Sequence, residues 1–262
     1  MDGVCKLCLE AKELQESHSI PRSFFNKAKG NGGQVISMQK GREPRRENLD
    51  PKEPMLCFEC EQFLNSQYES YGIRLLRNPH NIRKNSDHII ISNFDYKRFY
   101  LFLLSILWRA SNAMDLHYSS VVGNPDFGEV MRHCIKNNIV RFNNKSQVKI
   151  DNFIKIRVLR IVDSTGNIPD HVIKSVLTNF AFGEIESING IGWYFIAEGF
   201  IFHYVFYPGE NYYDARTTRL NSQLTSGSHQ KIQKVELSKD RMLAEMFNYM
   251  IECSKGYHQQ RE

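Results

Sequence analysis

The hydrophobic and polar positions divide the chain into two parts with different patterns. Residues 26–54, NKAKGNGGQVISMQKGREPRRENLDPKEP, hold few apolar residues and many Gly, Asn, Pro and charged ones, so they predict a poor hydrophobic core. Within them, GQVISMQ favours one short strand of a hairpin. After residue 87 apolar positions recur regularly. The pattern predicts a small unit at residues 1–86, ending in the basic linker NPHNIRKNSD, and a larger unit at residues 87–262.

Helical periodicity predicts several helices. The first begins at or within the second CxxC pair and places on one face Phe58, Leu64, Tyr68, Tyr71 and Leu75. A long helix is expected over residues 94–115, with Asn93 or Ser92 as its cap. Because it is apolar over most of its surface, we expect it to be buried. Shorter helices are expected over 126–137 and in the final segment SKDRMLAEMFNYMIECSK, with Ser238 as the cap.

Most of the strand patterns lie in the larger unit. HIIISN and NFIKIRVLRIVD predict strands, and the second alternates apolar and basic residues as a half-buried strand does. GWYFIAEGFIFHYVFYPG predicts a central hairpin that turns at Glu198–Gly199. RTTRLNSQLTSGSHQKIQK is expected to be a polar loop. Residues 87–262 are therefore expected to form an α+β domain with a buried helix and an antiparallel sheet.

Composition and charge narrow the class of protein. The chain has 262 residues, of which 41% are hydrophobic and 24% charged, as in folded soluble proteins. The formal net charge of +5 favours anionic partners but leaves a nucleic-acid role open. MDGVCKLC has no apolar signal region, and the longest apolar run, FYLFLLSILW, has ten residues, too few to span a bilayer. We expect a cytoplasmic protein that does not enter the membrane.

Four of the six cysteines form two CxxC pairs. Cys5 and Cys8 make the first pair, and Cys57 and Cys60 make the second after 48 intervening residues. Four thiolates complete the tetrahedral shell of a structural zinc ion, and cytoplasmic thiols favour metal binding over disulfides. The sequence therefore predicts a structural zinc that supports the core-poor unit at residues 1–86 and has no open position for catalysis.

The residues around these pairs resemble a known family. CKLC, SHSIP, the Asn48 segment ENLDPKEPMLC and CFECE follow the order found in zinc-stapled HNH, or ββα-metal, endonucleases. The pattern is most similar to the bacterial type in which SHxIP is paired with LCxxCE, and it covers about residues 1–75. The resemblance implies a small ββα module, nuclease activity on DNA more than RNA, and a setting in defence against phage.

The resemblance also implies roles for particular residues. His18 matches the general base that activates water, and Glu61 stands where the family places a ligand of the catalytic Mg²⁺ or Mn²⁺. Asn48 matches the family asparagine. Phosphate contacts are expected from a set of arginines: Arg22, Arg42, Arg45 and Arg46.

A second class of function stays open. Ser17 stands where the family usually has an aspartate beside the histidine, and a hydroxyl is a weaker ligand for magnesium than a carboxylate. The same zinc module without catalysis would bind nucleic acid or a partner protein. Glu69, about 12 Å from Glu61 along a helix, is expected to pair with an arginine rather than share one ion. The larger unit is expected to sense, to dock a partner or to form a homodimer.

Overall fold

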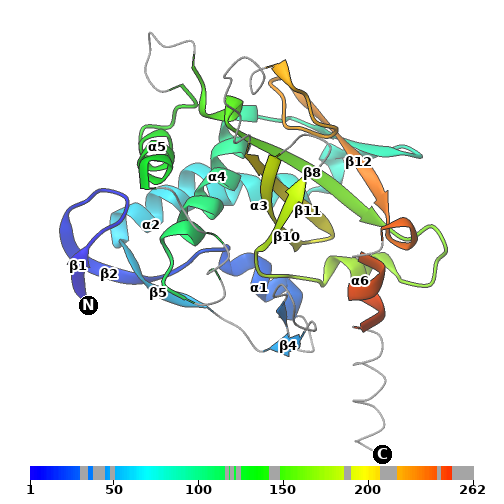
Figure 1. Ribbon diagram of the computed structural model, residues 1–262, viewed down its shortest axis with the longest axis horizontal. Helices are drawn as coiled ribbons and strands as arrows, with labels where there is room; N and C mark the ends of the chain where they lie inside the picture. Colours follow the sequence, from blue (N-terminus) through cyan, green and yellow to red (C-terminus); the bar gives the residue numbers. More distant parts are fainter. Residues whose placement is uncertain are drawn as a thin grey trace, which may run out of the picture.

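The computed structural model describes residues 1–29, 35–37, 45–47, 51–115, 118, 121, 125–141, 148–185, 190–206, 217–240 and 243–249. It is a mixed α+β structure, as the sequence predicted (Figure 1). Across these ranges, no helix combines the length and the apolar content that crossing a bilayer requires.

The N-terminal part contains a small antiparallel sheet with the order β1–β2–β5. Its strands are β1 (Asp2–Val4), β2 (Ala11–His18) and β5 (Lys52–Cys57). Helix α1 (Arg22–Lys29) follows β2. A separate hairpin of β3 (Val35–Ser37) and β4 (Arg45–Glu47) confirms the strand expected in GQVISMQ.

One almost continuous helix follows the second CxxC pair. It consists of α2 (Phe58–Leu64), the π-helical segment η1 (Asn65–Glu69) and α3 (Ser70–Arg77). A π-helical turn offsets the backbone hydrogen bonds, and Arg98 donates to two of the carbonyls here, those of Gln67 (2.5 Å) and Ser66 (2.9 Å). This arginine therefore supports the interruption in the α-helical ladder.

The larger part is built on a seven-stranded sheet with the order β6–β7–β12–β8–β11–β10–β9. Every neighbouring pair is antiparallel except β12 and β8, so the expected antiparallel sheet contains one parallel pair. Its strands are β6 (Ile82–Lys84), β7 (His88–Ser92), β8 (Ile154–Val162), β9 (Ala181–Ile185), β10 (Gly190–Ala197), β11 (Phe200–Phe206) and β12 (His229–Glu236).

The helices of this part cover both faces of the sheet (Figure 1). The longest, α4 (Tyr96–Asn112), is joined by α5 (Pro125–Lys136) and α6 (Asp170–Lys174). The 3₁₀ turns are η2 (Pro79–Asn81), η4 (Ile150–Asn152) and η6 (Leu237–Lys239), and residues 243–249 form a last helix.

Helix α4 is buried as predicted, because it lies between the sheet and the N-terminal helices. The Tyr204 hydroxyl on β11 donates to the Leu103 carbonyl (2.9 Å), and the Tyr100 hydroxyl donates to Ile154 at the start of β8 (2.8 Å). On the other side α3 approaches so closely that a Cβ added to Gly72 would lie 2.3 Å from the Phe102 ring. Only glycine fits at this crossing.

The main hydrophobic core runs from the small sheet into the large one. Phe24 of α1 lies 6.4 Å, centroid to centroid, from Phe102 of α4 and 6.1 Å from Phe202 of β11. The Arg77 guanidinium of α3 binds the Glu198 carboxylate in the β10–β11 turn, with Nε 2.9 Å from Oε1. The division at residue 86 stays a prediction, but the two parts share this core.

Several local expectations were wrong. The cap of α4 is Asp95, whose carboxylate accepts from the Arg98 amide at 3.0 Å, because Asn93 is in a turn with φ of 55°. The cap before the last helix is Asp240, which accepts from the Leu243 amide at 3.0 Å, and not Ser238. The linker expected at 78–87 contains η2 and the edge strand β6.

Candidate metal centre

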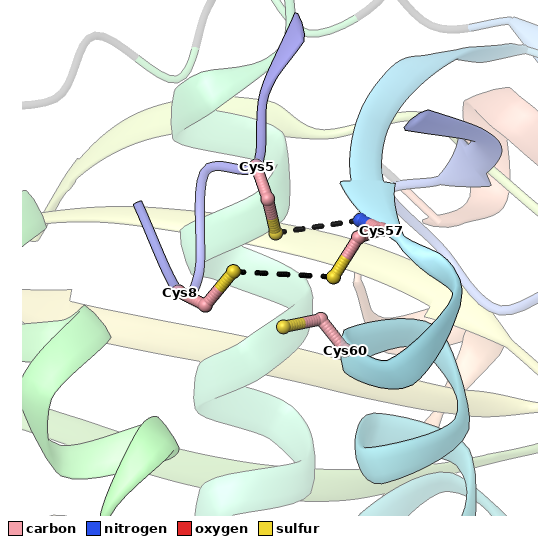
Figure 2. A group of neighbouring side chains, drawn as sticks. All are labelled: Cys5, Cys8, Cys57 and Cys60. Atoms are coloured by element: carbon pink, nitrogen blue, oxygen red, sulfur yellow. Dashed lines mark hydrogen bonds between the residues drawn. The ribbon is translucent and has the colours of Figure 1, made fainter. Parts of the chain in front are cut away.

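The four cysteines of the two CxxC pairs converge on one point (Figure 2). Cys5 and Cys8 lie in the turn between β1 and β2, Cys57 ends β5, and Cys60 is in the first turn of α2. Their sulfur atoms all lie within 4.8 Å of one another. Tetrahedral zinc, with Zn–S bonds of about 2.3 Å, requires sulfurs about 3.8 Å apart. The Cys8 and Cys57 sulfurs are 3.9 Å apart, so the group fits a zinc ion.

Backbone hydrogen bonds shape the first pair for this role. The Cys5 amide donates to Glu10 (2.9 Å) and the Leu9 amide donates to Cys5 (2.9 Å), which closes the turn. Leu9 has a φ of 64°, a left-handed conformation that reverses the chain in little space. The Lys6 amide donates to Met55 of β5 at 3.1 Å and so fastens the turn to the strand that carries Cys57.

Cys5, Cys57 and Cys60 are buried and Cys8 is half-buried, and burial opposes ionisation of the thiols. Burial raises the pKa of Cys57 to about 11, and it raises the pKa of Cys60 further. At Cys5 the effect of burial is outweighed by the backbone amides of Cys8, Cys57 and Leu7, and the pKa falls to about 7. The Cys57 amide lies 3.3 Å from the Cys5 sulfur (Figure 2). A divalent cation would supply the positive charge that four thiolates so close together need.

A residue of helix α5, in the larger unit, contacts the turn that carries Cys5 and Cys8. The Arg132 guanidinium donates to the Leu7 carbonyl (Nη1 to O, 2.7 Å), while Nε and Nη2 bind the Glu129 carboxylate at 2.6 and 2.5 Å. Its pKa is raised mainly by Glu129 against the opposing effect of burial, with a smaller contribution from Cys8. Sequence reasoning missed Arg132, because only the fold brings α5 over the cysteine turn.

His18 is the last residue of β2 and is half-buried. Its ring centroid lies 6.0 Å from that of Phe25, at an angle of 46°. On the paired strands Leu14 is opposite Cys57 and His18 is opposite Lys52. His18 therefore lies about 13 Å along the strand from the metal end, at about 3.3 Å per residue.

Ser17 contributes to strand pairing rather than to an open site. Its side chain is 2% exposed, its hydroxyl donates to Gln15 (3.3 Å), and it accepts from the Leu56 amide of β5 (3.3 Å). Consecutive strand residues point to opposite faces, so Ser17 faces away from the His18 side. A Ser17–His18 pair at one metal ion is therefore not supported by this geometry.

Glu61 follows Cys60 on α2 and is half-buried. Its Oε1 atom is buried and has no hydrogen-bond partner among the described residues. Most buried polar atoms have a partner, so this oxygen requires an explanation. The four cysteines are brought together, but in the described part of the chain the structure establishes no shared position for His18 and Glu61.

Of the remaining predicted site residues, the structure describes the side chain of one. Arg22 begins α1 and is exposed. Asn48 and Arg42 lie outside the described residues, and for Arg45 and Arg46 the structure describes only the backbone of β4.

Glu69 binds an arginine, as expected. Its Oε1 lies 2.6 Å from Nη2 of Arg109, an α4 residue that is 1% exposed. This buried ion pair joins the N-terminal helices to the central helix, so its role is structural.

We compared the chain with known protein families, curated proteins and solved structures. No family model, no curated protein and no solved structure matches this chain. Any function must therefore be argued from the chain's own residues.

Proposed function

We propose that this chain is a zinc-stapled, metal-dependent endonuclease of the HNH type that cleaves DNA phosphodiesters. His18 acts as general base, and Glu61 is a ligand of the catalytic Mg²⁺ or Mn²⁺. The observation that carries the proposal is that the four cysteines meet at the junction of β5 and α2, next to the elements that bear these residues. His18 ends β2, whose partner β5 ends at Cys57, and Glu61 follows Cys60 on α2.

The buried oxygen of Glu61 supports the cation assignment. Oε1 has no hydrogen-bond partner among the described residues, and a hard divalent cation would satisfy it. The chemistry of His18 supports the base assignment. A histidine side chain can accept a proton from water as a general base, and the half-buried His18 ring, 6.0 Å from the Phe25 ring, keeps part of its surface accessible.

The proposal extends to substrate contact and setting. Phosphate oxygens would be held by Arg22, Arg42, Arg45 and Arg46, with Asn48 near the reacting groups. A cytoplasmic location, a role in defence against phage, and a partner or second copy bound through residues 87–262 belong to the same proposal.

A second candidate function is a zinc module that binds nucleic acid or a protein without catalysis. The observation that favours it is the position of Ser17. Its hydroxyl forms hydrogen bonds with the backbone of β2 and β5. Ser17 therefore does not replace the aspartate that usually binds the catalytic metal beside the histidine.

A cleavage assay separates the two candidates. Purified protein is incubated with supercoiled plasmid in Mg²⁺ or Mn²⁺, beside His18→Ala and the matched control His80→Ala, an exposed histidine of η2. Loss of a general base lowers the rate about 10²–10⁴-fold, and the control should cleave at the wild-type rate. Melting temperature and zinc content must be equal in all three proteins. Equal rates for His18→Ala and wild type would reject His18 as the base.

The cation assignment needs its own variant. Glu61→Gln preserves the shape of the side chain but removes its charge, so the magnesium concentration for half-maximal rate should rise about tenfold or more. Glu59→Gln is the matched control, because Glu59 lies in the same helical turn but is exposed and 3.6 Å from the Lys12 ammonium. An identical magnesium dependence for both variants contradicts the assignment. No cleavage by wild type, combined with tight DNA binding, supports the non-catalytic candidate.

A further inference from the structure

A cavity of about 640 Å³ lies beside the start of β8, within the larger part of the molecule. Among its described lining residues are four cationic side chains and one carboxylate. They are contributed by Arg141, Lys149, Lys155, Arg219 and Asp151. The cavity belongs to neither the cysteine cluster nor the proposed nuclease residues.

The cavity forms where two parallel strands separate. Strand β12 pairs with β8 only at Arg160–Val162. Earlier along β8, residues 222–224 occupy the place of β12. The Leu224 amide donates to the Ile156 carbonyl (2.8 Å), and the Val158 amide donates to the carbonyl of Ser222 (3.1 Å). One wall of the cavity is therefore a loop held in the sheet by backbone hydrogen bonds.

A buried glutamine fixes the rest of this wall. Gln230 of β12 is 2% exposed; its Oε1 accepts from the Thr225 amide (3.0 Å) and its Nε2 donates to the Gln223 carbonyl (3.1 Å). The Gln223 side chain in turn accepts from the Leu220 amide at 3.1 Å. Since these side chains are used to hold the backbone, the cavity is preformed in the fold.

The cationic side chains come from three separate segments of the chain. Arg141 and Lys149 are opposite each other in a short antiparallel bridge, and Lys155 points from β8. Lys155 is 2% exposed, and its ammonium donates to the Thr218 carbonyl at 2.5 Å. Its pKa is lowered first by burial and then by the positive charge of Arg219, against a smaller opposing effect of Asp151. A concave wall with this excess of positive charge concentrates anions.

Asp151 adds a requirement for a hydrogen-bond donor. The Tyr96 hydroxyl donates to one carboxylate oxygen, and the pKa of Tyr96 is raised by burial and by this carboxylate, so the phenol stays protonated. The other oxygen, Oδ1, is buried and without a hydrogen-bond partner among the described residues. Such an oxygen needs a donor, and a hydroxyl or amino group of a bound molecule would supply one.

We propose that this cavity binds a phosphorylated small molecule of nucleotide size. The cationic side chains hold its phosphate oxygens, with arginine suited to two-point contact and lysine acting as a point charge. A hydroxyl or amino group of the organic part donates to Asp151. The volume is within the range of about 300–1,000 Å³ typical of small-molecule sites, and it exceeds what a lone phosphate fills.

Calorimetric titration of the full chain tests the proposal without any cleavage reaction. The probes are the four ribonucleoside triphosphates and monophosphates, adenosine, inorganic pyrophosphate and a 12-nucleotide DNA strand, all without magnesium. At least one nucleotide should bind while adenosine does not. Arg219→Ala should weaken that binding about tenfold or more, as expected for a lost charged hydrogen bond. The matched control Lys231→Ala removes an exposed lysine of β12 that does not line the cavity and should bind as wild type does.

Asp151→Asn separates recognition of the organic part from attraction of phosphate. Losing the carboxylate removes a repulsive charge, so pyrophosphate should bind as well or better, while the nucleotide loses the acceptor for its donor group. The ratio of nucleotide to pyrophosphate affinity should therefore fall about tenfold. Equal melting temperatures establish that each variant folds. The proposal is overturned if no nucleotide binds, if Arg219→Ala leaves nucleotide affinity unchanged, or if only the DNA strand binds.

Discussion

Glu69→Gln removes the counter-charge of a buried arginine while keeping the size of the side chain. In the folded protein Oε1 of Glu69 is 2.6 Å from Nη2 of Arg109, and the two side chains are 17% and 2% exposed. Arg109 otherwise donates from Nε to the Ser105 carbonyl at 3.3 Å. The variant therefore leaves a positive charge in the core with no carboxylate beside it.

The expected loss of stability is about 3 kcal/mol. Breaking a buried ion pair by removing one partner costs about 3–5 kcal/mol, and the partial exposure of Glu69 places the estimate at the lower end. For a chain of this size, that corresponds to a fall of about 6–12 °C in melting temperature. Glu10→Gln removes the acid of the exposed Lys12–Glu10 pair and should cost less than about 1 kcal/mol.

Urea unfolding followed by tryptophan fluorescence measures both variants, because Trp108 lies next to Arg109 in α4 and is 1% exposed. Zinc content is measured in parallel so that metal loss is not mistaken for loss of the ion pair. The double variant Glu69→Gln with Arg109→Met replaces the pair by apolar and neutral groups and should recover most of the loss. If Glu69→Gln costs no more than Glu10→Gln, the buried-pair reasoning is refuted.

Burial, with a smaller effect of Arg157, lowers the pKa of His203 to about 3, so the folded protein keeps a neutral ring while the unfolded chain binds a proton below about pH 6.5. The free energy of unfolding is therefore highest above pH 6.5 and falls towards pH 3 by up to about 1.4 kcal/mol per pH unit. His203→Gln should reduce this fall when urea unfolding is measured at pH 7 and pH 5. An equal fall in the variant and the wild type would contradict the assignment to His203. Gly199→Ala should lower the free energy of unfolding by about 2–3 kcal/mol, since φ is 75° and a Cβ would lie 1.8 Å from Nη1 of Arg160. Gly183→Ala, where a Cβ meets nothing within 4 Å, is the control, and equal losses at the two glycines would show that the turn is not strained by alanine.

Elements with a strong hydrophobic period could be predicted from the sequence. Helix α4, strand β8 and the turn at Glu198–Gly199 all form close to where the pattern indicated. In each, apolar side chains decide the local structure and the same side chains fill the core, so local and global preferences agree.

Strand β12 could not be predicted because its buried positions are partly polar. The segment was expected to be a loop, yet Gln230 and Ile232 face inward while His229 and Lys231 face solvent. Gln230 is buried because its amide holds the loop beside β8, which only the folded chain reveals. Lys155 was expected on the exposed face of a half-buried strand, but it is 2% exposed and its ammonium donates to the Thr218 carbonyl.

The ligands of the metal centre could be predicted from the sequence, but the orientation of the helix that follows Cys57 could not. Two CxxC pairs indicated the four cysteines, and the structure brings them together. Phe58 was expected on the buried face of the first helix, but it is 58% exposed. Cys60 must face the other cysteines, and a residue two positions away on a helix is turned by about 200°, so Phe58 points outward.

The most direct test of the zinc-stapled fold is elemental analysis of the purified chain. Wild type should carry about one zinc per chain, and Cys57→Ser should lose it together with the folded structure of the N-terminal sheet. Cys134→Ser is the matched control, because Cys134 is equally buried but lies outside the cluster, and it should keep the metal. A folded wild-type chain without zinc, or a Cys57→Ser chain with unchanged zinc, would contradict the four-cysteine site.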